Sequence, residues 1–174
     1  GLDSIEVTRR PKVAILSTGN ELLSPGEKIS SGKIFDSNSY SLYSSIIQTG
    51  GIPLMLGISK DSIENLEEKI HGAFNSDLLI TSAGVSKGDY DIVKDFLSKN
   101  GEIKLWSVNM KPGKPLAFGS LKRNAKKSLP HIGLPGNPVS SLVAFHQFVR
   151  PAIHKMMGRK PTEIPTIKAI LENK

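Results

Sequence analysis

The chain has 174 residues, and 23 Lys and Arg against 16 Asp and Glu give it a formal net charge of +7. This length suits one compact domain, and the positive balance favours an anionic partner such as a phosphorylated small molecule or an oxyanion. The absence of cysteine excludes disulfides and thiolate chemistry. The sequence shows no signal peptide and no run of about 20 apolar residues, which predicts a cytoplasmic protein without a membrane partner.

The first half of the chain alternates apolar runs with amphipathic segments. Residues 12–17, 52–58 and 77–82 are short apolar runs flanked by glycine, proline or polar residues, which predicts three strands, the first of them buried in a parallel sheet. Helices are predicted from Asp36 or Ser37 to Thr49 and from Lys60 to Phe74, because apolar side chains recur there at three- and four-residue steps. The long Pro/Gly/Ser-rich loop that precedes the first helix is more typical of a functional segment than of a plain connection.

The second half continues the alternation and then changes character. A helix over residues 92–99 and a strand over 103–108 are followed by two strands, 116–121 and 129–134, which a basic turn joins as a pair. The last helix runs from Leu142 to Met157, and Pro151 is expected to kink or break it near the Gln147 carbonyl. We therefore predict a domain over residues 1–157, and a linker with the first strand of a following domain over residues 158–174.

Strands that alternate with helices predict the α/β class: a three-layer, mostly parallel, doubly wound sheet with helices on both faces. Ligands of such sheets bind at the carboxyl ends of the strands, near the point where the strand order reverses. Four unusual segments follow predicted strands, and we expect them to share this rim: Thr18–Leu22, Ala83–Asp91, Lys111–Pro115 and Pro135–Ser140.

The segment from Gly133 to Ser141 predicts a rigid loop between a strand and a helix. Pro135 and Pro138 fix their own φ angles, and Pro138 disfavours helical geometry at Asn137, so the helix begins at the proline. Free N–H groups and the positive end of the helix dipole make this loop a candidate anion site. A well-formed strand-to-helix connection explains the same residues, and the loop alone does not separate these two interpretations.

Acidic and basic side chains beside these loops have two interpretations as well. Asp61, Asp89 and Asp91 supply the carboxylate oxygens that Mg²⁺ prefers, although Asp61 and Asp91 also stand where helix caps occur. Lys111 and Lys114 flank a Pro-Gly pair that can hold both ammonium groups toward one anion, or they are two solvated surface lysines.

Several other functional classes are disfavoured. The four histidines form no metal-ligand pattern, and neither of the standard glycine-rich nucleotide loops is present. Ser140 lacks the context of a serine-hydrolase nucleophile. The ten aromatic residues are scattered through core-like positions, which argues against a nucleic-acid partner that stacks its bases on the protein.

Five motifs occur together in one order over roughly residues 10–157. They are Thr18-Gly19-Asn20-Glu21-Leu22, Asp36-Ser37-Asn38, Gly84-Val85-Ser86-Lys87-Gly88-Asp89-Tyr90-Asp91, Lys111-Pro112-Gly113-Lys114-Pro115, and Gly133-Leu134-Pro135-Gly136-Asn137-Pro138-Val139-Ser140. In this combination the chain resembles the molybdopterin molybdenumtransferase family, which includes the bacterial MoeA type and the E domain of gephyrin.

The resemblance implies a MogA/MoaB-like fold and the Mg²⁺-dependent insertion of molybdate into adenylylated molybdopterin, with release of AMP. Matched by position, it implies catalytic roles for Asp61, Asp91, Lys111 and Lys114, and binding of Mg²⁺ by Asp61, Asp89 and Asp91. It implies that the cofactor is bound by Thr18, Gly19, Asn20, Glu21, Asp36, Ser37, Asn38, Gly84, Val85, Ser86, Pro135, Gly136, Asn137, Pro138 and Ser140. The implied partners are the small-molecule substrates, a second copy of the full-length protein, and the molybdopterin adenylyltransferase in a transient contact.

The chain also departs from the family pattern. It has Asn20 where the family usually has aspartate, Ala83 where glycine is frequent, and Ser107 where some members have lysine. Family members are about twice as long, so we expect this single domain to bind adenylylated molybdopterin with little or no release of AMP. Two alternatives stay open, namely a molybdopterin adenylyltransferase and a non-catalytic cofactor-binding or scaffold module.

Overall fold

The structure is a computed structural model that describes residues 1–60, 62–83, 96, 98–124, 127–160, 166–170 and 172. Its centre is a six-stranded sheet in which only β7 runs against the other strands, so the predicted α/β class with a mostly parallel sheet is confirmed. From one edge to the other the strands are β4 (Ile52–Ser59), β1 (Lys12–Thr18), β5 (Leu78–Ser82), β8 (Lys127–Leu134), β7 (Pro115–Asn124) and β6 (Gly101–Ser107).

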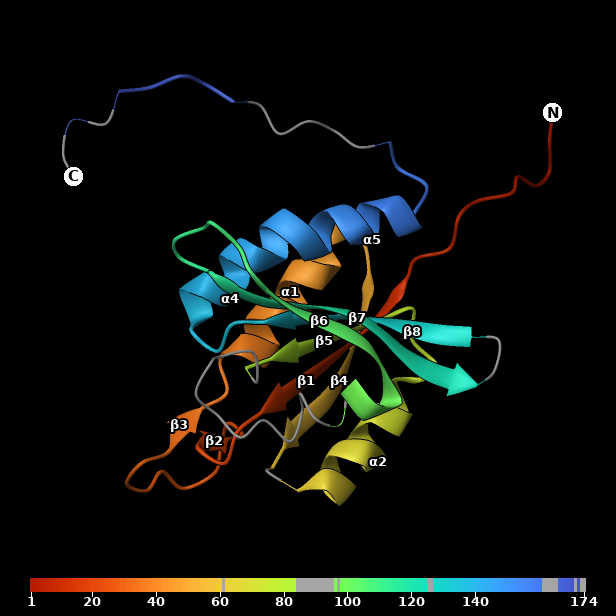
Figure 1. The fold of residues 1–174 in the computed structure, drawn as a ribbon. Helices are drawn as coiled ribbons and strands as arrows, with labels where there is room; N and C mark the ends of the chain where they lie inside the picture. Colours follow the sequence, from red (N-terminus) through yellow and green to blue (C-terminus); the bar gives the residue numbers. More distant parts are fainter. Residues whose placement is uncertain are drawn as a thin grey trace.

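Helices cover both faces of the sheet, as Figure 1 shows. α1 (Asn38–Thr49), α4 (Pro138–Ala144), the π-helix η1 (Phe145–Val149) and α5 (Arg150–Met156) lie on one face, and α2 (Ile63–Ala73) lies on the other. Among the described helices, none is long and apolar enough to cross a membrane.

The core has two parts because the parallel strands are buried on both faces. Alternate residues of β1 point to opposite sides, so Val13 and Ile15 pack with α1, η1 and α5, while Ala14 and Leu16 pack with α2. The strand order reverses at β1: the chain passes from β1 to β4 through α1, and returns through α2 to β5 on the other side of β1. This places a switch point at the carboxyl ends of β1 and β5.

The helix predicted near the C-terminus stays helical from Pro138 to Met156, and it changes from α4 to η1 and then to α5, so the disturbance predicted near Gln147 is a π turn and not a break. Proline has no N–H, so the carbonyl of Gln147 loses its helical partner, and the backbone widens into the π turn Phe145–Val149. The helix begins at Pro138, and Asn137 is extended with ψ 127°, as predicted.

Three local predictions need correction or extension. α2 is capped by the Ser62 side chain, which accepts from Asn65 N, and Asp61, the predicted cap, lies outside the described residues. Residues 166–170 form no strand and are exposed, because no described strand lies beside them to complete a ladder. The loop after β1 contains two short paired strands that the sequence did not indicate, β2 (Leu22–Leu23) and β3 (Ile34–Phe35).

Candidate functional site

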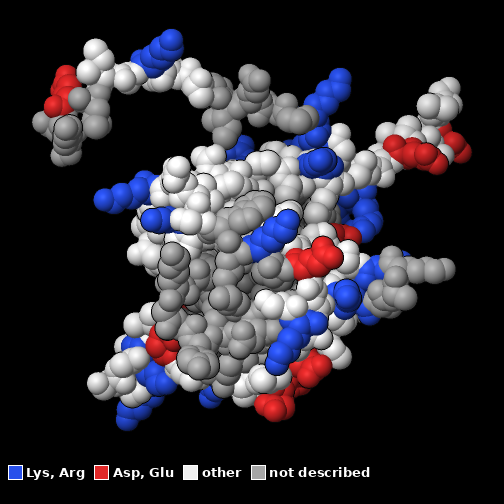
Figure 2. Space-filling model, viewed as in Figure 1, with Lys and Arg blue, Asp and Glu red and all other residues white. Residues whose placement is uncertain are grey.

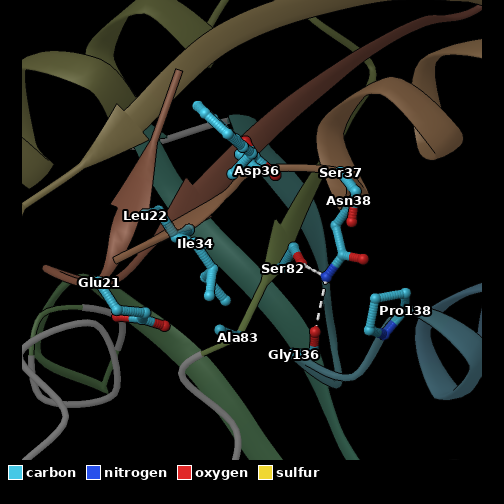
Figure 3. Close-up of a pocket in the computed structure, with 11 residues that line it drawn as sticks. Glu21, Leu22, Ile34, Asp36, Ser37, Asn38, Ser82, Ala83, Gly136 and Pro138 are labelled. Atoms are coloured by element: carbon cyan, nitrogen blue, oxygen red, sulfur yellow. Dashed lines mark hydrogen bonds between the residues drawn. The ribbon is translucent and has the colours of Figure 1, made fainter. Parts of the chain in front are cut away.

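A pocket of about 250 Å³ opens at the switch point, beside the carboxyl end of β5. Figure 3 shows its three sides: the β2–β3 arm, the start of α1, and the connection from β8 to α4. This volume accommodates part of a drug-sized ligand, such as one ring system. The pocket is lined by Glu21, Leu22, Ile34, Phe35, Asp36, Ser37, Asn38, Ser82, Ala83, Gly136 and Pro138.

The β2–β3 arm is held in place by backbone hydrogen bonds. Ile34 N donates to Glu21 O (2.9 Å) and Asp36 N donates to Leu23 O (2.9 Å), which pairs the two ends of the long loop. The Lys33 ammonium donates to Asn20 O at 2.6 Å. The arm thereby supplies an apolar wall with one carboxylate, Glu21, at its edge.

The Asn38 side chain joins three segments that are distant in sequence. Its Nδ2 donates to Ser82 Oγ at 2.7 Å and to Gly136 O at 2.8 Å, which links the start of α1 to the end of β5 and to the Pro135–Pro138 loop. Because the two acceptors fix the amide orientation, Asn38 Oδ1 is left buried without a hydrogen-bond partner among the described residues. Asn38 therefore sets the width of the pocket on this side.

Asp36 holds the first turn of α1 against the sheet. Its carboxylate accepts from Ser39 N (3.1 Å) and from Ser39 Oγ (2.6 Å), and Ser39 Oγ is also 2.8 Å from Ser17 Oγ of β1. These buried side chains satisfy a free N–H group of the helix, which is the role of a cap. The prediction that Asp36 or Ser37 caps this helix is thus confirmed for Asp36, since the Ser37 side chain makes no cap hydrogen bond.

The Pro135–Pro138 loop makes a capped and closely packed connection. Asn137 Oδ1 accepts from Ser140 N at 3.1 Å and lies 3.4 Å from Ser140 Oγ, so both side chains take part in capping α4. Gly136 faces Ala83 so closely that a Cβ on this glycine would lie 3.3 Å from the Ala83 Cβ. Ala83 itself has a φ of 74°, a left-handed conformation that favours glycine.

The second proline-containing loop reaches the same end of the sheet. A Cβ on Gly113 would lie 3.5 Å from Ser140 O, and Val108 N donates to Lys114 O at 2.8 Å, so this loop rests on the start of α4. Lys111 and Lys114 are exposed and do not line the pocket. Figure 2 shows that Lys and Arg side chains are scattered over the viewed face and form no single cluster there.

One buried histidine lies beneath the pocket. His131 is fully buried on β8, and its Nε2 lies 3.0 Å from Thr81 Oγ1, one residue before the pocket residue Ser82. Burial lowers the pKa of His131 from its usual value near 6.5 to about 3. The imidazole is therefore neutral at physiological pH and acts as a structural group.

The predicted site residues fall into three groups. Glu21, Asp36, Ser37, Asn38, Gly136 and Pro138 line the pocket. Thr18, Gly19, Asn20, Pro135, Asn137, Ser140, Lys111 and Lys114 belong to the segments around it without lining it. Asp61, Gly84, Val85, Ser86, Asp89 and Asp91 lie outside the described residues, and within the described part of the chain no three His, Asp or Glu side chains could hold a metal ion together.

Five pocket residues were missed as site residues: Leu22, Ile34, Phe35, Ser82 and Ala83. Ile34 and Phe35 are an apolar pair directly before the Asp36-Ser37-Asn38 motif, and this position beside a predicted site motif could have indicated that they belong to the site. Ser82 and Ala83 end an otherwise apolar strand at the predicted rim. Their positions followed from the strand order, which the sequence alone did not specify.

Comparisons with known proteins agree on one group. Residues 14–155 match the family model described as a probable molybdopterin binding domain. The molybdopterin molybdenumtransferase of Nostoc sp. is 44% identical over 156 residues, which cover 88% of this chain and 35% of that relative. The molybdopterin molybdenumtransferase of Haemophilus influenzae is 40% identical over 95% of this chain and 40% of its own length. The chain thus spans well under half the length of these relatives.

A solved structure agrees with the sequence relatives. The molybdopterin biosynthesis MoeA protein of Pyrococcus horikosii superposes with a TM-score of 0.74 at 35% identity, covering 87% of this chain and 36% of that chain. The architecture described above is therefore shared with one part of a larger protein.

Proposed function

Because the chain belongs to the probable molybdopterin binding domain family, we propose that it binds molybdopterin in the pocket beside β5, as the cofactor-binding domain of a molybdopterin molybdenumtransferase. The observation that carries this proposal is the convergence of three family-like motifs on one pocket. Glu21, Asn38 and Gly136 come from segments far apart in the chain, and all three line the same 250 Å³ space. A pocket at the switch point of a parallel sheet is where such folds bind ligands.

The described residues suit one part of an adenylylated cofactor. The apolar wall of Leu22, Ile34 and Phe35 can cover the flat face of a ring, and the Glu21 carboxylate can accept hydrogen bonds from ring N–H groups. Lys111 and Lys114, on the loop that rests on α4, can attract the phosphate groups or molybdate as point charges. In this proposal the pocket orients the ligand, and the lysines act on its anionic end.

Magnesium belongs to the proposal as a cofactor held by Asp61, Asp89 and Asp91. Three carboxylates are a donor set that fits Mg²⁺, which prefers oxygen ligands and keeps several waters. When bound, the ion would neutralise charge on the pyrophosphate of the adenylylated substrate.

The proposal is tested by incubating the chain with adenylylated molybdopterin, Mg²⁺ and molybdate, and measuring bound ligand and released AMP. We expect binding with little AMP release, because the chain spans only 35–40% of the relatives' length. Glu21→Gln should weaken binding, whereas Glu67→Gln on α2, away from the pocket, should not. Absence of binding would refute the proposal, and AMP release at the full rate would refute the need for further domains.

A second reaction mixture, which contains ATP and molybdopterin, tests the adenylyltransferase alternative. A chain that adenylylates molybdopterin releases pyrophosphate when it is given ATP and molybdopterin, whereas a molybdenumtransferase does not. We expect no pyrophosphate release.

A further inference from the structure

A second pocket, of about 400 Å³, opens on the face of the sheet that α2 covers. Figure 1 shows α2 on the side of the sheet away from α1, α4 and α5. The pocket lies near the amino end of β5, because its residue Arg123 donates a hydrogen bond to the carbonyl of Ser76, two residues before that strand begins. The pocket proposed for molybdopterin lies at the carboxyl end, beside Ser82. The second pocket, here called the α2–β7 pocket, is therefore separate, and none of the five motifs lines it.

The floor of the α2–β7 pocket is apolar. Ile70 of α2 and Leu121 of β7 are fully buried, and Phe96 is 8% exposed. All three belong to the part of the core that packs between the sheet and α2. A hydrocarbon ring in this pocket would continue the core and lose its contact with water, which is favourable for binding.

Flat side chains border the same space. The rings of His71 and Phe74, both on α2, lie with their centroids 5.2 Å apart and are tilted by 31°. Together with Phe96 they offer faces and edges against which another ring can pack. The volume of about 400 Å³ lies within the range of pockets that hold small organic ligands, about 300–1,000 Å³. Shape and lining thus favour a flat ligand of one or two rings.

A β-bulge brings the basic residues of β7 to this pocket. Between Lys122 and Asn124 the pairing with β8 shifts, which makes Arg123 the extra residue of the bulge. Consecutive residues of a regular strand point to opposite faces, yet Leu121, Lys122 and Arg123 all line the pocket. Bulges commonly re-aim a side chain beside a binding site.

The positive charges at this pocket are not neutralised by the protein. Neither Lys122 nor Arg123 forms an ion pair among the described residues, and the buried Nε of Arg123 has no hydrogen-bond partner among them. The pKa of Asp77 is lowered chiefly by its hydrogen bond from Arg9 and least by the charge of Arg123, so Asp77 is paired with Arg9. Glu67 is the one carboxylate in the lining, which leaves an excess of one positive charge.

We propose that the α2–β7 pocket is a binding site for a small aromatic carboxylate, whose ring lies on the apolar floor and whose carboxylate faces Arg123 and Lys122. A guanidinium binds a carboxylate through two parallel hydrogen bonds, and the ammonium of Lys122 adds a second positive charge. The excess of one positive charge in the lining matches the single negative charge of such a ligand. This site does not depend on molybdopterin binding, so either proposal can fail without the other.

A titration of the full chain with 2-naphthoate, a two-ring aromatic carboxylate, tests the proposal. The chemical shifts of the backbone amides, followed by nuclear magnetic resonance without any cofactor, report where the ligand binds. We expect changes at Phe74, Leu121 and Arg123, and none at Asn38 and Ser82 in the other pocket. The uncharged analogue 2-naphthamide should bind about 5-fold more weakly, because it forms no ion pair with the basic residues.

Substitutions of the basic residues test the role of charge. Lys122→Gln should weaken binding about 3-fold, whereas the matched control Lys104→Gln, an exposed lysine of β6 outside the pocket, should leave the affinity unchanged. Arg123→Gln should weaken binding by about 10-fold or more, since both the charge and the two-point hydrogen bonding are lost. Arg123→Lys keeps the charge and should restore part of the affinity. The dispersion of the amide spectrum shows whether each variant is folded.

The other outcomes overturn the proposal. Unchanged amide shifts at millimolar 2-naphthoate would show that the pocket does not bind an aromatic carboxylate. Changes confined to the surroundings of Asn38 and Ser82 would place the ligand in the other pocket. Equal affinity for 2-naphthamide, or an equal loss in Lys104→Gln and Lys122→Gln, would show that the charges lining the α2–β7 pocket do not select the ligand.

Discussion

Replacing Asn38 with aspartate changes one donor into an acceptor at the joint between three segments. In the structure Asn38 Nδ2 donates to Ser82 Oγ at 2.7 Å and to Gly136 O at 2.8 Å. A carboxylate of the same shape donates to neither. We therefore expect Asn38→Asp to loosen the start of α1 from β5 and from the Pro135–Pro138 loop, and to widen the pocket.

The expected cost follows from the two lost hydrogen bonds. Each contributes about 1 kcal/mol net, and the Gly136 carbonyl is left facing a second acceptor, so the free energy of unfolding should fall by about 3 kcal/mol. For a chain of this size that corresponds to a drop of roughly 6–12 °C in the melting temperature. Asn38→Ala should cost less, about 2 kcal/mol, because it introduces no repulsion.

Urea unfolding followed by circular dichroism measures the effect. Asn75→Asp is the matched control, since it makes the same change of charge at an exposed position and should shift the free energy of unfolding by less than about 0.5 kcal/mol. A double-mutant cycle between Asn38→Ala and Ser82→Ala should give a coupling of at least about 0.5 kcal/mol. If Asn38→Asp is no more destabilising than Asn75→Asp, the two hydrogen bonds of Asn38 do not stabilise the joint between these segments.

Three further predictions concern stability. Ala83→Gly should raise the free energy of unfolding by about 1 kcal/mol in chemical denaturation, because Ala83 has a φ of 74° and glycine adopts this conformation without the Cβ penalty; a destabilised variant would contradict this. His131 has a pKa of about 3 in the folded chain and near 6.5 when unfolded, so the unfolded state binds more protons between these values and stability should fall as the pH drops below about 6.5, by up to about 1.4 kcal/mol per unit. His131→Gln should flatten that part of the pH profile, and an unchanged slope would show that other groups cause it. The hydrogen bonds from Arg9 are the chief cause of the lowered pKa of Asp77, so this carboxylate stabilises the folded chain above its unfolded pKa of about 4, and the stabilisation is lost as the pH falls below that value. Asp77→Asn should therefore lose less stability in acid than the unaltered chain. An equal loss in both proteins would show that Asp77 does not cause it.

Much of the fold could be predicted because its periodicities are strong. The apolar runs that became β1 and β5 are short and continuous, as expected of strands buried on both faces, and the run that became β4 is equally apolar although β4 lies at the edge of the sheet and is partly exposed. Pro151 marked the change to π-helical hydrogen bonding in the last helix, since a proline in a helix interior always removes one N–H donor. The β2–β3 arm was not predicted, because two-residue strands leave no periodicity to detect.

The site could be predicted as a set of segments but not as a pocket. The motifs around Glu21, Asn38 and Gly136 were recognised one by one. The rule that ligands bind at the carboxyl ends of parallel strands then predicted that the loops after these strands lie at the same edge of the sheet. Which side chains face the pocket depended on contacts across the sheet. Ser140 was one of the residues expected to bind the cofactor, and in the structure its N–H donates to Asn137 Oδ1 at the start of α4.

The sequence by itself determined the alternation of strands and helices, the irregular turn ahead of Pro151 and the motifs that identify the family, since each depends on residues close together in the chain. Only the tertiary structure decided that Asn38 bridges Ser82 and Gly136, and that Lys111 and Lys114 lie outside the pocket. The physical reason is the range of the interactions. Local backbone preferences and hydrophobic periodicity act over a few residues, whereas these contacts join residues that come together only when the strand order is fixed.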